Sequence, residues 1–178
     1  MSIPEVVFTK QDAGRYTVHA VRGDGAVVVM PPSDRRFRVP HDRAHFAVER
    51  ELGLADGVFG TVMAGGLFDT MRIVGGRRRH DDRQRGAALA RANSATHAVT
   101  VAEVLAGVVH QAVEARTQPD LDSLTREQWG TVRQDPFPFT LDQLTSARRS
   151  LDELAEKWTD LETGSHLTVP WTVPVAHR

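Results

Sequence analysis

The segment Arg15-Tyr-Thr-Val-His-Ala-Val-Arg22 alternates apolar and polar residues and leads through Gly23-Asp-Gly25 into Ala26-Val-Val-Val-Met30. Alternation with β-branched residues predicts strands, and the short glycine turn predicts that these two strands are antiparallel neighbours. A third apolar run, Glu5 to Lys10, precedes them behind a turn at Asp12-Ala13-Gly14. We therefore expect an antiparallel β-meander over residues 5–39.

The hydrophobic period becomes helical at Pro40, and residues 40–164 predict a bundle of about four helices. The longest expected helix runs from about Gly86 to Arg116, and the last begins at a capping box formed by Thr140 and Gln143. Prolines restrict residues 165–178 to an extended edge strand or arm. Together these elements predict one α+β domain over residues 1–178.

Composition excludes several classes of site. The chain has 22 basic and 23 acidic residues and no cysteine, so we do not expect a nucleic-acid binder, and any metal must be bound by His, Asp or Glu. The start of the sequence does not resemble a signal peptide, and the apolar stretch Val58 to Phe68 is too short to span a bilayer. We therefore expect a cytoplasmic protein without a membrane partner.

The segment that follows Pro40 is the strongest candidate for a functional site. On a helix, His41 and His45 lie within about 40° of each other on the apolar face, and Glu49 lies at the edge of that face. A buried neutral imidazole needs a partner for its ring nitrogens, which can be a metal, a carboxylate or a carbonyl.

The pattern His41-Asp42-x-x-His45 resembles the HExxH helix of zinc metallopeptidases, with aspartate in place of glutamate. The resemblance implies that His41 and His45 bind zinc or another divalent transition metal and that Asp42 is the general base of a metal-dependent hydrolase. Glu49 is our second candidate for a catalytic carboxylate. The resemblance also requires a third metal ligand.

For that third ligand, the long helix offers His97, which falls in the middle of an apolar face with Val101, Val104 and Val108. We expect His41, His45 and His97 to converge on one interior. On the same helix, Glu103, His110 and Glu114 fall on the opposite side and predict a solvated polar face. The alternative is a non-enzymatic interaction or regulatory module, in which the buried histidines are a structural polar cluster without metal.

Two further segments carry predictions. Apolar residues of the last helix recur at spacings of three and four; these residues are Leu144, Leu151, Leu154, Trp158 and Leu161. This pattern favours a homodimer through the last helix, and packing within one chain is the alternative. Residues 72–91 contain seven arginines and two aspartates, which predicts a solvated loop.

Overall fold

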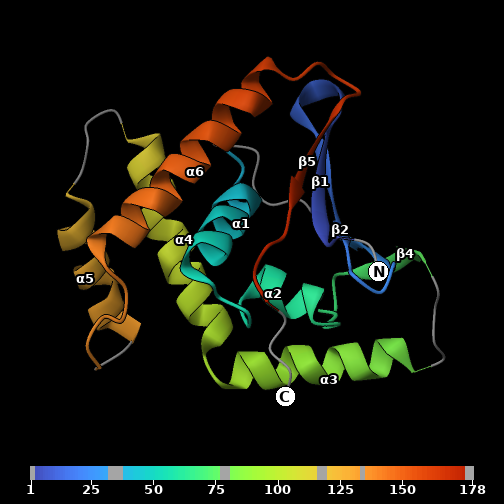
Figure 1. Cartoon of the computed structure of the whole chain (residues 1–178), viewed down its shortest axis with the longest axis horizontal. Coiled ribbons are helices and arrows are strands. Elements are labelled where there is room, and N and C mark those ends of the chain that lie inside the picture. The colour runs from blue at the N-terminus through green and yellow to red at the C-terminus, as the bar shows by residue number, and fades with distance from the viewer. Residues whose placement is uncertain (1–2, 32–37, 77–80, 116–119, 133–134, 175–178) are drawn as a thin grey trace.

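The computed structural model describes residues 3–31, 38–76, 81–115, 120–132 and 135–174. Figure 1 shows a twisted sheet at one side of the molecule and helices α1, α4, α5 and α6 beside it, with α2 and α3 below. Strands precede most of the helices in the chain, and the sheet is entirely antiparallel. The predicted α+β class is therefore confirmed.

The sheet has the strand order β4-β3-β2-β1-β5. The meander β1 to β3 is confirmed, and so is the edge strand near the C-terminal end, since β5 pairs with β1 from Glu5↔Pro170 to Thr9↔His166. Part of the expected meander, residues 32–37, lies outside the described residues. The strands are β1 (Glu5–Lys10), β2 (Tyr16–Val21), β3 (Val27–Met30), β4 (Arg72–Gly75) and β5 (His166–Pro170).

The described residues form six α-helices rather than about four. The expected helix over 86–116 is two helices, because His97 adopts a left-handed conformation with φ 61° and breaks it. The helices are α1 (His41–Leu52), α2 (Val58–Met63), α3 (Asp82–Ala95), α4 (Ala98–Glu114), α5 (Leu121–Val132) and α6 (Leu141–Asp160).

The prediction of a solvated loop over 72–91 is wrong at both ends of that range, while residues 77–80 lie outside the described residues. Residues 72–75 form β4, which extends the sheet beside β3, and residues from Asp82 onward form the first part of α3. Close packing explains the helix: a Cβ atom at Gly86 would lie 2.9 Å from the Gly65 carbonyl oxygen, so α3 rests directly on the segment after α2. Tertiary contact thus gives order to an arginine-rich segment that has no strong periodicity of its own.

Helix α1 lies in the middle of the molecule. Its Phe46 ring packs edge-on against Phe8 of β1 with centroids 5.9 Å apart, while other faces of α1 contact α4 and α6. The helix is consequently buried on most sides, and side chains that it carries are held by neighbours from the sheet and from two other helices. This position gives polar groups on α1 little freedom to move.

Helix α6 begins at the predicted capping box, in which Thr140 and Gln143 each bond the backbone of the other. Its apolar stripe is covered inside the chain: Leu144 and Leu151 are fully buried and Leu154 is nearly so, against α1 and α4. The apolar seam that favoured a homodimer is therefore used within one chain. A homodimer stays a prediction, but this stripe no longer supports it.

Arg43 of α1 is a buried cation in an aromatic cage. Its guanidinium lies 3.6 Å from the centroid of the Trp158 ring, with Phe8 and Tyr16 at 5.1 and 5.5 Å. The residue is 0% exposed, and its three side-chain nitrogens have no hydrogen-bond partner within the part of the chain that the structure describes. Burial lowers the pKa of Arg43 to about 10. The aromatic rings only partly compensate for the lost hydration of this charge.

We expect Arg43→Met to raise the free energy of unfolding by about 1–2 kcal/mol. Replacing an incompletely compensated buried charge with an apolar side chain of similar length is often stabilising. We expect the relief of this burial penalty to exceed the loss of the cation–π contacts, which are worth roughly 2 kcal/mol or less. Urea unfolding followed by circular dichroism measures the change. A loss of stability would show that the guanidinium has polar partners that offset its burial.

Candidate metal centre

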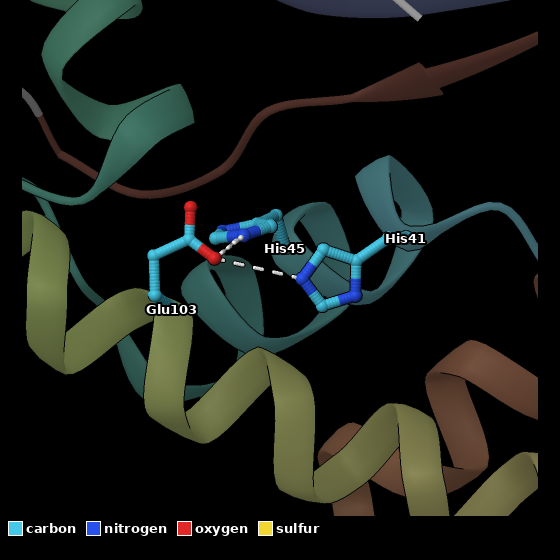
Figure 2. Close-up of side chains that lie close together, drawn as sticks. All are labelled: His41, His45 and Glu103. Atoms are coloured by element: carbon cyan, nitrogen blue, oxygen red, sulfur yellow. Dashed lines mark ion pairs between the residues drawn. The ribbon is translucent and has the colours of Figure 1, made fainter. Parts of the chain in front are cut away.

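Three side chains of kinds that can bind a metal ion meet where α1 crosses α4. Figure 2 shows His41 and His45 projecting from α1 toward Glu103 of α4. The Nε2 atoms of His45 and His41 lie 3.1 and 3.6 Å from the same oxygen, Oε2 of Glu103. One potential ligand atom from each residue lies within 4.8 Å of the others, so this group could hold a metal ion.

The other ring nitrogen of His45 is held by Glu49. The Nδ1 atom of His45 lies 3.3 Å from Oε1 of Glu49, whose side chain is 0% exposed. The same carboxylate accepts hydrogen bonds from the backbone N–H groups of Val58 at 2.9 Å and Gly60 at 3.0 Å, at the start of α2. Gly57 makes room for it, because a Cβ there would lie 2.5 Å from Cδ of Glu49. Glu49 thus fixes the orientation of the His45 ring through the ring nitrogen that does not face Glu103.

The other ring nitrogen of His41 faces His110. The two Nδ1 atoms are 3.4 Å apart, and Nε2 of His110 lies 2.7 Å from the carbonyl oxygen of Val39. A carbonyl only accepts, so Nε2 of His110 carries a proton; burial lowers the pKa of His110, which leaves its Nδ1 as an acceptor. With a metal bound, the Nδ1 proton of His41 would lie in this contact, which would leave the lone pair of its Nε2 for the ion.

The cluster strongly favours a positive charge. Burial alone would lower the pKa of His45, but its hydrogen bonds to Glu103 and Glu49 outweigh burial and raise that pKa to about 9. Hydrogen bonds from His41 and His45 hold the pKa of Glu103 far below its usual range. In the absence of a metal, a proton on Nε2 of His45 therefore occupies the place between the imidazole and the ionised Glu103.

The two predicted catalytic carboxylates have other contacts. Asp42 accepts a hydrogen bond from the Tyr16 hydroxyl and does not belong to the cluster. Glu49 is fully buried, and its oxygens are taken by two backbone N–H groups and His45. Both residues therefore have contacts that orient α1 and its histidines.

The expectation that His97 turns inward is wrong. His97 is exposed at the start of α4, and the cluster does not include it. The error comes from treating residues 86–116 as one helix: the chain turns at His97, so its direction cannot be extrapolated from Val101, Val104 and Val108. No glycine or proline marks this break in the sequence.

The expectation that this side of α4 is solvated is wrong for His110, which is buried, whereas the side chain of Glu103 is 54% exposed, as expected. His110 is buried and contacts His41, while Glu103 completes the cluster with His41 and His45. Helix α4 packs against α1, α3, α5 and α6, so a wide part of its surface is covered and the residues at its edge meet neighbours. Glu103 and His110 are two turns apart on one side of α4, and this spacing was the sequence signal that could have predicted that both residues contact α1.

Comparison with known proteins adds no relative. No family model, curated protein or solved structure matches this chain. Among the described residues, no helix is both long enough and apolar enough to cross a bilayer. Any functional conclusion must therefore come from the chemistry of the site itself.

Proposed function

We propose that this protein binds a divalent transition metal, zinc in the first instance, through His41, His45 and Glu103, and that the site serves a metal-dependent hydrolase. The supporting observation is the convergence of two Nε2 atoms and a carboxylate oxygen while both Nδ1 atoms are held by other groups. Metal-binding histidines characteristically have such an outer partner on the second nitrogen.

A three-residue donor set favours catalysis over a structural role. Structural zinc sites are usually closed by four protein ligands, whereas catalytic sites use three and keep a position for water or substrate. The side chains of Glu103 and His41 are 54% and 28% exposed, so one side of the cluster faces solvent. A divalent ion held there would supply a Lewis acid and would lower the pKa of a coordinated water to roughly 7.

In this proposal the protein groups have separate roles. His41, His45 and Glu103 hold the ion; Glu49 and His110 orient the two imidazoles. Asp42 as general base remains a hypothesis that rests on the HExxH resemblance, and its hydrogen bond to Tyr16 favours an orienting role instead. The carboxylate of Glu103 is more accessible to solvent than that of Glu49, which is fully buried.

The second candidate function is a non-enzymatic interaction or regulatory module. It is favoured by one observation: Glu49 and Glu103 flank the two ring nitrogens of His45 and raise its pKa, so that a protonated imidazole would satisfy the cluster without any metal. A buried cation with two carboxylate partners can fix the packing of α1 against α4. In that case the cluster would be part of the fold alone.

Metal titration of the chelator-treated protein separates these candidates. We expect one Zn²⁺ or Co²⁺ per chain by calorimetry, a higher melting temperature on loading, and weaker binding as the pH falls, because the ligands must lose protons to bind. Hydrolysis of ester and peptide substrates that is lost with chelator and restored by Zn²⁺ would support the enzyme. Failure to bind either ion at millimolar concentration, with an unchanged melting temperature, would favour the non-enzymatic module.

A further inference from the structure

Helix α4 carries a glycine, Gly107, between the two residues that contact the ring of His41. Glu103, Gly107 and His110 are spaced by four and three residues, so they lie along one side of the helix. The ring of His41 approaches Glu103 within 3.6 Å and His110 within 3.4 Å. The ring therefore spans the stretch of α4 in which Gly107 lies.

Packing does not require a glycine at position 107. A Cβ built there meets nothing within 4 Å, and Gly107 does not have a positive φ. At Gly57 and Gly60, by contrast, a Cβ would collide with Glu49 or with the backbone at 2.5 Å. A glycine inside a helix costs about 1 kcal/mol relative to alanine. The fold thus bears that cost at Gly107 although no atom within 4 Å would obstruct a Cβ there.

We propose that Gly107 is the contact surface for the ligand of the metal site, and that this ligand is a small organic molecule with an anionic or carbonyl oxygen donor. The inference rests on the proposed function. The oxygen takes the open position at the ion, and the body of the molecule lies against the bare backbone of α4. Without a side chain at position 107, a flat group can approach the helix closely.

The charges at the site favour this ligand class. A divalent ion on two neutral imidazoles and the ionised Glu103 leaves one net positive charge to be matched by a ligand. Carboxylate, hydroxamate and polarised carbonyl oxygens meet that demand. The carboxylate of Glu114 does not compete for the open position, because its Oε1 accepts the backbone N–H of Val39 at 2.9 Å.

The test uses the Co²⁺-loaded full chain and two probes with the same metal-binding head, acetohydroxamate and benzohydroxamate. Their affinities are measured by titrating the visible spectrum of cobalt in the wild type and in Gly107→Leu. Gly130→Leu is the matched control. Gly130 is also a helical glycine, and a Cβ built there also meets nothing within 4 Å, but it lies on α5 rather than on α4. Thermal melts and the cobalt spectrum without probe verify that each variant folds and holds the ion.

We expect Gly107→Leu to weaken benzohydroxamate by at least tenfold relative to Gly130→Leu, and to weaken acetohydroxamate less. If the leucine variant does not fold, Gly107→Met, with an unbranched side chain, takes its place. Benzohydroxamate affinity within threefold of the control would overturn the inference while Co²⁺ binding upholds the metal site. Failure of the wild type to bind Co²⁺ would instead refute the proposed function itself.

Discussion

Replacing Glu103 with glutamine is expected to weaken Zn²⁺ binding by more than about 100-fold. Glu103 contributes the only carboxylate oxygen among the three proposed ligands, and that oxygen lies near both His45 and His41. An amide is uncharged and a poorer donor for a transition metal. Since outer partners of metal ligands alone are worth 10- to 100-fold in affinity, loss of a direct ligand should cost more.

The measurement is competitive titration against a chromophoric chelator. Glu127→Gln is the matched control, because it makes the same chemical change on the exposed surface of α5 and should leave the affinity unchanged. His45→Ala should likewise abolish binding. Retention of wild-type affinity by Glu103→Gln would place the ion elsewhere and remove the basis for the proposed hydrolase.

Replacing Glu49 with alanine is expected to lower the free energy of unfolding by about 3–5 kcal/mol. Its carboxylate is fully buried and serves three donors: the backbone N–H groups of Val58 and Gly60 and the Nδ1 of His45. Removing one member of a buried charged network leaves the other polar groups without compensation, which is among the most destabilising kinds of substitution. Helix α2 should loosen first, because its N-terminus depends on this side chain.

Urea denaturation of the metal-free protein measures this loss, with Glu127→Ala as a surface control that should change stability by less than about 0.5 kcal/mol. Hydrogen exchange at Val58 and Gly60 gives a local readout and should be faster in Glu49→Ala. A loss below about 1 kcal/mol would show that the two backbone groups find other acceptors. Glu49 would then be dispensable for the fold.

The sequence predicted those elements whose signals lie within the element itself or at its ends. The antiparallel meander follows from alternating residues and short glycine turns, and α6 begins at the Thr140 capping box as expected. The strand β5 was predictable as an edge strand because Pro170 at its end and Pro174 beyond it cannot donate to a ladder. The strand β4 was missed because its two apolar residues, Ile73 and Val74, are too few to show a period, and pairing with β3 forms it.

The candidate site also has a part that the local sequence predicted and a part that only packing between distant segments decided. The sequence alone determined that His41 and His45 share one side of α1 and that Glu49 follows them, because helical spacing is a local property. Only the tertiary structure decided that Glu103 rather than His97 joins His41 and His45 in one cluster, and that His110 and Glu49 contact the imidazoles. The physical reason is that the choice depends on a turn at His97 and on how α4 crosses α1, and both arise from packing between segments distant in the chain.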